Sequence, residues 1–178
     1  MSGAVAAARQ DGGVRTHTVM DSPVGHLTIV SAEGAVVRLH MDWDEPAHDP
    51  AEVGERDDEA GAEVVRQLTE YFAGERTDFN VPLAPEGDDF KQRVWGLLRE
   101  IPYGQTRSYG DLARQLGDVN LSQAVGFANG RNPIAIIVPC HRVIGADGSL
   151  VGYAGGLDRK RILLALEEPS ADDGGRLF

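Results

Sequence analysis

The chain has 178 residues, of which 42% are hydrophobic and 25% charged, and its formal net charge is −11. This length and composition suit one domain or two small ones, and they exclude a wholly disordered chain. Cys140 is the sole cysteine, which excludes an intrachain disulfide and a cysteine zinc cluster. No apolar run approaches the roughly 20 residues of a membrane helix, and the start lacks the apolar stretch of a signal peptide. We therefore expect a cytoplasmic protein without membrane contact.

The charge is unevenly distributed along the sequence. Residues 1–85 carry 6 Lys/Arg against 16 Asp/Glu, whereas residues 91–161 carry 10 Lys/Arg against 5 Asp/Glu. This asymmetry is compatible with a DNA-facing domain attached to an acidic domain. Two ordinary solvated surfaces would give the same pattern, so the charge alone leaves both interpretations open.

Three short strands are predicted near the amino terminus, over Thr16–Met20, His26–Ser31 and Ala35–Met41. Pro23–Gly25 and Glu33–Gly34 have turn composition and separate the runs. The strands are therefore expected to form an antiparallel meander.

The rest of the first half has less periodicity. We expect residues 1–13 to be a flexible tail and residues 14–85 to form a small amino-terminal domain. Within it, Trp43–Asp58 is rich in Asp, Glu and Pro and predicts an exposed loop. Apolar residues at helical spacing from Ala60 to Phe72 predict a helix. Residues 81–88, with two prolines and a glycine, predict a linker.

The second domain, residues 86–170, is predicted to be mostly helical and to precede a flexible tail at 171–178. One helix is expected from Phe90 to Ile101. Ser108 is expected to cap a second helix, and Asn120 a third that ends at Gly130. The short connection between the last two is typical of a helix-turn-helix, although a plain αα-hairpin fits it as well. We expect an α+β protein: an antiparallel sheet plus helix, then a helical domain with a winged-helix-like helix-turn-helix.

Cys140 follows Ile134–Val138, an apolar run that predicts a buried strand or extended segment. A thiol at the end of a rigid core element is well placed to react, although a lone cysteine is more often a small buried hydrophobe. His141 and Arg142 come next, and either could favour the thiolate. Neighbouring side chains diverge, so a water bridging Cys140 and His141 is as plausible as direct contact. Glu167, on a helix predicted over Asp158–Glu168, could orient His141 or could be an exposed helix-end charge.

Several motifs together resemble one family, the O6-alkylguanine-DNA alkyltransferases (methylated-DNA–protein-cysteine methyltransferases). The resemblance runs from about Phe90 to Glu167 and is weaker in the amino-terminal half. The motifs that carry it are Pro139-Cys140-His141-Arg142-Val143, Ser108-Tyr109-Gly110, Ala124-Val125-Gly126, Ala128-Asn129, Asn132-Pro133 and Gly152-Tyr153-Ala154-Gly155-Gly156-Leu157.

The resemblance implies repair by direct, irreversible, single-turnover transfer of the alkyl group of O6-alkylguanine, and of O4-methylthymine, from duplex DNA to Cys140. It implies that His141 acts through a water as the base and that Glu167 orients His141. Asn132 would brace the turn before the active-site segment. Tyr109 would help to extrude the base and then donate a hydrogen bond to it. A buried methyl group requires such base flipping.

The resemblance also implies which residues meet the DNA and the alkyl group. The helix Leu121–Gly130 would enter the minor groove, and on it Ser122, Gln123 and Asn129 are expected to face outward. The DNA-binding set is Tyr109, Gly110, Ser122, Gln123, Ala128, Asn129 and Arg131, and the alkyl-pocket set is Pro139, Val143, Tyr153, Ala154 and Gly155. We expect no metal and no cofactor, and a monomer that can cluster on DNA.

One position departs from the family pattern. The family commonly places an intercalating arginine 17 residues before the cysteine, and Gln123 stands there in this chain. Glutamine can insert and hydrogen-bond, but it lacks the charge and the planar fork of arginine. Two other functions compete with alkyl transfer. A Cys-His-Glu hydrolase or thiol-redox enzyme shares the nucleophile but does not explain the paired helices, and a non-catalytic damage sensor would lack the cysteine.

Overall fold

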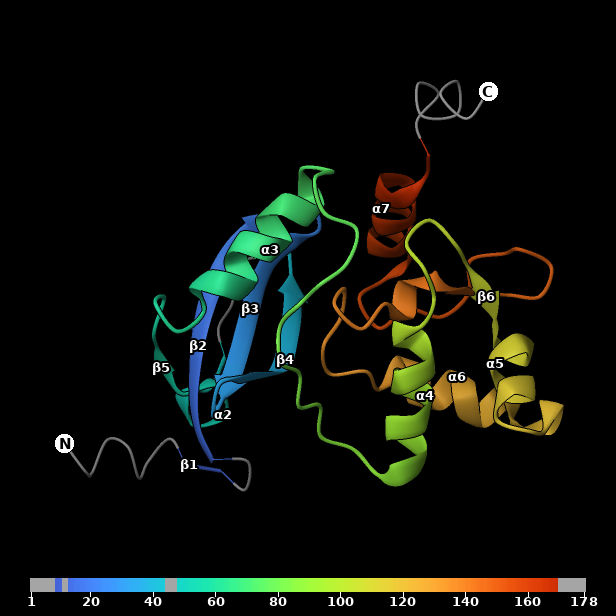
Figure 1. Ribbon diagram of the computed structural model, residues 1–178, viewed down its shortest axis with the longest axis horizontal. Helices are drawn as coiled ribbons and strands as arrows, with labels where there is room; N and C mark the ends of the chain where they lie inside the picture. Colours follow the sequence, from blue (N-terminus) through green and yellow to red (C-terminus); the bar gives the residue numbers. More distant parts are fainter. Residues whose placement is uncertain (1–8, 11–12, 44–47, 170–178) are drawn as a thin grey trace. The chain divides into compact units, whose positions relative to one another are not determined.

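The computed structural model describes residues 9–10, 13–43 and 48–169. The chain divides into two compact units. Unit 1 contains the residues up to Asp88 together with 132–137, and unit 2 contains 89–131 and the residues from Val138 onward. From the sequence, the first domain is expected to end at residue 85 and residues 132–137 to belong to the second domain. In the structure, contacts group residues 86–88 and 132–137 with unit 1. The expected α+β class is confirmed, with the sheet in unit 1 and most helices in unit 2 (Figure 1).

The predicted meander of unit 1 is confirmed. Strands β2 (Gly13–Ser22), β3 (Gly25–Ala32) and β4 (Ala35–Asp42) pair antiparallel in sequence order. A short strand, β1 (Arg9–Gln10), pairs with the start of β2, so the expected tail 1–13 contains a paired segment. Residues 1–8, 11–12 and 170–178 lie outside the described residues, and with them most of both expected tails.

The prediction of an exposed loop over Trp43–Asp58 is wrong about secondary structure in its second half, although most of that half is exposed. Helix α2 (Pro50–Val53) begins at the Asp49 cap, and β5 (Glu55–Arg56) pairs parallel with β2. Between them Gly54 has φ 76°, and a Cβ there would lie 1.8 Å from the Arg15 carbonyl oxygen. Only glycine tolerates this conformation at such close range. Residues 44–47 lie outside the described residues.

Both faces of the central strand β3 are covered. Val30 and Ala32 form a buried cluster with Val53 of α2. Ile29 points to the opposite face because side chains alternate along a strand. That face also carries Thr18, which is the register partner of Ile29. The Thr18 side chain lies against Gly61 at the start of α3 (Ala62–Phe72). Figure 1 shows α3 running along this face of the sheet.

The predicted linker 81–88 also contributes to unit 1. Leu83 bridges Val36 of β4, and the Pro82 carbonyl accepts a hydrogen bond from the Val36 amide at 2.9 Å. Residues 132–137 lie at β4 too, since the Leu39 amide donates to the Pro133 carbonyl at 2.8 Å and Leu39 bridges Ile134. The chain therefore leaves unit 2 after Arg131, packs against the sheet of unit 1, and returns to unit 2 just before Cys140.

Unit 2 begins with three helices, α4 (Asp89–Arg99), α5 (Tyr109–Gln115) and α6 (Ser122–Gly130). Ser108 caps α5 as predicted, in a capping box with Asp111. The predicted Asn120 cap is wrong, because Asn120 lies inside a 3-10 turn, η1 (Val119–Leu121), which is capped by Asp118. Buried Trp95 of α4 donates its indole N–H to the Ala128 carbonyl of α6 at 2.9 Å, which ties these two helices together.

The end of unit 2 carries the remaining elements. A 3-10 turn, η2 (Cys140–Arg142), leads into β7 (Val143–Ile144), which pairs parallel with β6 (Arg107–Ser108). Helix α7 (Leu157–Glu167) closes the described part of the unit. Within residues 9–10, 13–43 and 48–169, no helix has the length and hydropathy needed to cross a bilayer.

Candidate active site

The segment that leads to Cys140 is buried as predicted, but it is not a strand. Ile134 makes a single bridge and the chain then turns, with the Ile137 amide donating to the Ala135 carbonyl at 2.8 Å. Ile136 has φ 74°, a left-handed conformation that is strained for a β-branched residue. Such strain persists only where surrounding packing enforces it. Cys140 therefore follows a tightly turned, buried lead and is itself 6% exposed.

Three ionisable side chains meet beside the cysteine. His141 Nε2 lies 2.8 Å from Glu167 Oε2, and Arg142 donates to both oxygens of the same carboxylate, at 2.8 and 3.0 Å. Arg142 also donates to the Ile101 carbonyl at 2.6 Å. Glu167 is 2% exposed, which excludes the alternative of a solvated helix-end charge. The carboxylate thus fixes one edge of the imidazole while Arg142 balances its charge.

The histidine is held neutral. Its complete burial lowers the pKa of His141 below the ordinary value of 6.5, and this outweighs the opposing effect of Glu167. Nδ1, the other ring nitrogen, is buried and has no hydrogen-bond partner in the protein. A neutral imidazole whose Nε2–H donates to Glu167 presents Nδ1 as a proton acceptor. This is the protonation state that a general base requires.

Two further side chains respond to the charge of Cys140. Burial is the main cause that raises the pKa of Tyr109, and a thiolate at Cys140 raises it further. Lys160 is fully buried, and its Nζ donates to the carbonyls of Val143 at 2.6 Å and Val151 at 3.0 Å. Burial lowers the pKa of Lys160, while the cysteine charge opposes that shift. A buried ammonium group near the thiol therefore adds to the positive potential that favours a thiolate.

Lys160 is a residue that the sequence analysis missed. It shares a face of α7 with Leu163 and Glu167, at the i, i+3 and i+7 spacing of a buried stripe. That spacing is the signal that could have found it, because a lysine in a buried stripe needs polar partners. Here backbone carbonyls of β7 and of the loop before α7 supply them.

The other residues expected at the reacting centre also lie on described segments. The Tyr109 hydroxyl donates to the Val151 carbonyl at 3.1 Å. Asn132 Oδ1 accepts the Ile134 amide at 3.0 Å, which fixes the turn into the active-site lead. Of the expected alkyl-pocket residues, Pro139 and Val143 are buried, Tyr153 and Gly155 are half-buried and Ala154 is exposed.

Helix α6 carries most of the expected DNA contacts. Gln123 and Arg131 are exposed, whereas Ser122 and Gly110 are half-buried. The expectation that Asn129 faces outward is wrong. Asn129 is 3% exposed, and its Nδ2 lies 3.5 Å from the carbonyl oxygen of Cys140. Ala128 is buried too, so neither side chain is presented to a partner; Asn129 instead links α6 to the active-site turn.

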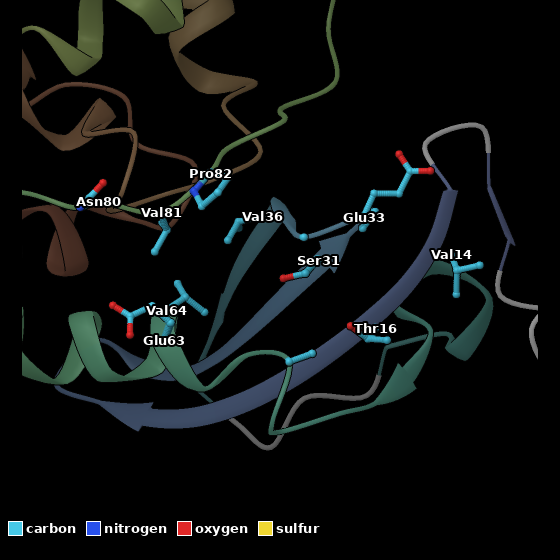
Figure 2. Close-up of a pocket in the computed structure, with 13 residues that line it drawn as sticks. Val14, Thr16, Ser31, Glu33, Val36, Glu63, Val64, Asn80, Val81 and Pro82 are labelled. Carbon is cyan, nitrogen blue, oxygen red and sulfur yellow. The ribbon is translucent and has the colours of Figure 1, made fainter.

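Unit 1 has a cavity of about 310 Å³ whose lining comes from the sheet, α3 and residues 80–82 (Figure 2). Most of the lining is apolar or small. Glu63 accepts hydrogen bonds from Arg66 and Gln67, so its carboxylate is already occupied. The lining contains no cysteine or histidine, and the reactive side chains described above belong to unit 2.

Among the described residues, no group of three or more His, Cys, Asp or Glu is placed to hold a metal ion. The site contains a single buried cysteine, Cys140, next in sequence to the paired His141 and Glu167. Together with the helical unit that holds them, these side chains define a protein with a cysteine nucleophile.

Comparison with known proteins identifies the class. The profile described as 6-O-methylguanine DNA methyltransferase, ribonuclease-like domain, matches residues 16–85, and the profile for the DNA binding domain of the same family matches residues 89–169. The chain belongs to the methylated-DNA–protein-cysteine methyltransferase family.

Individual relatives agree. A protein of this name from Mycolicibacterium paratuberculosis is 50% identical over 163 residues, which is 91% of this chain and 98% of the relative. The O6-methylguanine methyltransferase of Mycobacterium tuberculosis has a crystal structure that superimposes with a TM-score of 0.80 at 48% identity, covering 92% of this chain and 99% of that one. The structure of M. tuberculosis OGT in complex with DNA gives a TM-score of 0.78 at 49% identity, covering 86% and 92%.

Proposed function

We propose that this protein repairs DNA by moving the alkyl group of O6-alkylguanine, or of O4-methylthymine, from the duplex to Cys140, once per molecule. The observation that carries the proposal is the placement of Cys140 next to a neutral, buried His141 held by Glu167. Family membership supplies the substrate class, since relatives at about half identity carry the name methylated-DNA–protein-cysteine methyltransferase.

The chemistry follows from the side chains. His141 Nδ1 takes the proton of the Cys140 thiol through a bridging water. The thiolate attacks the alkyl carbon, a new C–S bond forms, and the C–O6 bond breaks with its electron pair passing to the guanine. Tyr109 exchanges its hydrogen bond to the Val151 carbonyl for one to a ring nitrogen of the leaving base. The departing base takes up one proton and His141 gives up the proton that it took from the thiol, so the net proton transfer is from the thiol to the base. The thioether product has no group that water can displace, so the protein is consumed.

The DNA must deliver a base to this buried thiol. Helix α6 is proposed to lie in the minor groove while the damaged nucleotide rotates out of the stack. Exposed Gln123 and Arg131 face the duplex, and Asn132 keeps the turn between α6 and the active-site lead. We also propose that the protein acts as a monomer and that several molecules can cluster on DNA. A cytoplasmic setting is part of the proposal as well, since a reducing compartment keeps a lone reactive thiol available.

Replacing Cys140 with serine tests this function. Cys140→Ser is expected to abolish methyl transfer because a serine hydroxyl is far less nucleophilic than a thiolate. Duplex binding should remain nearly intact, since the change barely alters volume and leaves α6 untouched. A methyl-transfer assay beside a mobility-shift titration measures both. Loss of binding together with transfer would make Cys140 a structural residue, and residual transfer would place the acceptor elsewhere.

A further inference from the structure

Helix α6 presents a phenylalanine to solvent on the face proposed to meet DNA. Phe127 is 58% exposed, although the same helix buries Val125 and Ala128 on its other side. Gln123 and Phe127 are four residues apart, so their side chains are neighbours on one exposed face. The largest apolar side chain of α6 therefore stands next to the glutamine that replaces the arginine of the family pattern.

Two cations from different segments converge on this ring. The guanidinium carbon of Arg131, just after α6, lies 4.8 Å from the ring centroid, and Nζ of Lys91 in α4 lies 5.9 Å from it. Both distances fall within the range of cation–π attraction. Residues 122–130 contain no Asp or Glu, in a chain whose net charge is −11. The surface around Phe127 therefore combines a planar apolar group with two cations, and α6 itself contributes no carboxylate.

Nucleic acid is the partner that this combination fits. Bases offer flat apolar faces for an aromatic ring, and the phosphates on either side offer negative charge to flanking cations. Aromatic and aliphatic side chains that enter the minor groove act as wedges that unstack a base step. A neutral glutamine is a weaker intercalating group than arginine, and the adjacent ring supplies the apolar surface that it lacks.

Resting on the proposed function, we infer that Phe127 is the wedge by which α6 opens the duplex, with Lys91 and Arg131 holding the phosphates beside it. Gln123 then fills hydrogen-bonding positions left by the extruded base, and Phe127 stacks on the neighbouring base. The ring contributes unstacking and a part of the duplex affinity that does not depend on salt. The two cations contribute the part of the duplex affinity that does.

The test measures affinity for a fluorescein-labelled unmodified duplex by anisotropy over 50 to 200 mM salt. Phe127→Ala is expected to raise the dissociation constant roughly tenfold at every salt concentration, the lower-middle part of the range for loss of one base–aromatic stack, with the salt slope unchanged. Arg131→Gln should instead reduce the slope by about one. Phe127→Trp should retain or exceed wild-type affinity because it keeps a stacking ring. Trp43→Ala is the matched control, since Trp43 is an aromatic side chain of unit 1 with 55% exposure.

A second readout separates opening of the duplex from binding. A 2-aminopurine base beside the target site should brighten when wild-type protein unstacks it and brighten less with Phe127→Ala. Reaction with free O6-benzylguanine, which needs no duplex, should be the same for both proteins. Equal affinity and equal brightening, with wild-type alkyl transfer intact, would overturn the wedge alone. So would self-association that falls in Phe127→Ala while duplex affinity holds, because the ring would then join copies of this chain. Wild-type protein that neither binds duplex nor accepts a methyl group would overturn the proposed function and the wedge together.

Discussion

The ion pairs of α3 in unit 1 and those of Glu167 in unit 2 lie in opposite environments. On α3 of unit 1, Arg66 pairs with Glu63 and Glu70 at the surface, and all three remain open to water. In unit 2, Glu167 pairs with His141 and Arg142 in a site where each side chain is at most 8% exposed. Exposed pairs add little to stability because water already solvates the ions. Buried pairs carry a desolvation cost that their mutual attraction must offset.

This contrast shows which unit buries ionisable side chains that its chemistry requires. Unit 1 could lose its surface pairs and keep its sheet, because β3 is covered by apolar residues on both faces. Unit 2 buries ionisable groups where apolar groups would have a lower desolvation cost, and two of them, His141 and Arg142, directly follow Cys140. Stability and function are therefore coupled in unit 2 and nearly separate in unit 1.

Removing the charge of Glu167 should give the largest effect on stability. Glu167→Gln leaves the buried Arg142 guanidinium without its counter-ion, and breaking a buried pair in this way costs about 3–5 kcal/mol. The same change removes the group that orients His141, so alkylation by free O6-benzylguanine should slow as well. Urea unfolding and a single-turnover assay measure the two effects.

The matched control is Glu63→Gln on the surface of α3. It removes the same charge from a pair that is open to water, and the free energy of unfolding should stay close to that of the wild type. If the two variants lose similar stability, the contrast between the units is wrong. If Glu167→Gln unfolds readily yet reacts at the wild-type rate, Glu167 is structural only.

Two histidines, one in each unit, should lower the free energy of unfolding as the pH is lowered. Burial lowers the pKa of His141 and, with help from His48, that of His40, both from an ordinary value of 6.5. As pH falls below about 6.5, these two histidines bind protons in the unfolded chain before they do so in the folded chain. The free energy of unfolding then falls, by at most about 1.4 kcal/mol per pH unit for each histidine.

Urea titrations of the wild type, His40→Gln and His141→Gln between pH 7.5 and 5 separate the contributions. Each variant should show a shallower loss of stability than the wild type. Only His141→Gln should also slow alkylation, because His40 belongs to unit 1 and has no part in the reaction. A wild-type slope that neither substitution changes would assign the pH dependence to other groups.

Gln123→Arg should leave stability nearly unchanged, since Gln123 is exposed on α6. It adds a cation that can stack and hydrogen-bond among bases and phosphates. We expect a faster apparent rate on O6-methylguanine in duplex DNA and a steeper salt dependence, while reaction with free O6-benzylguanine hardly changes. Assays of both substrates on one preparation decide the point. An equal response of both would mean that Gln123 touches the chemical step.

Local signals made much of the fold predictable. Alternating apolar residues and turn composition located β2, β3 and β4, and helical spacing located α3 and α4. Strand β5 gave no such signal because Glu55 and Arg56 are exposed and pair through their backbone alone. The run Ile134–Val138 has the composition of a core element, and composition reports burial but not the left-handed turn at Ile136.

The site residues that belong to recognisable motifs could be predicted from the sequence. The contacts that form only in the tertiary structure could not. Cys140, His141 and Glu167 follow from the resemblance, and the contact between His141 and Glu167 agrees with the expected geometry. The burial of Lys160 and the inward contact of Asn129 do not follow from it, since their polar atoms meet backbone carbonyls from other segments of the chain. A sequence shows which side chains are polar but not which carbonyls will meet them.

The central claim is that Cys140, activated by a buried His–Glu pair, is the acceptor of the alkyl group. Intact-mass spectrometry after incubation with excess duplex containing O6-methylguanine tests it most directly, followed by peptide mapping. Each molecule is expected to gain one methyl group in place of the thiol hydrogen of Cys140, a mass increase of one CH2 unit. Repair should stop after one equivalent. An unmodified protein, a methyl group on another residue, or repair beyond one equivalent would contradict it.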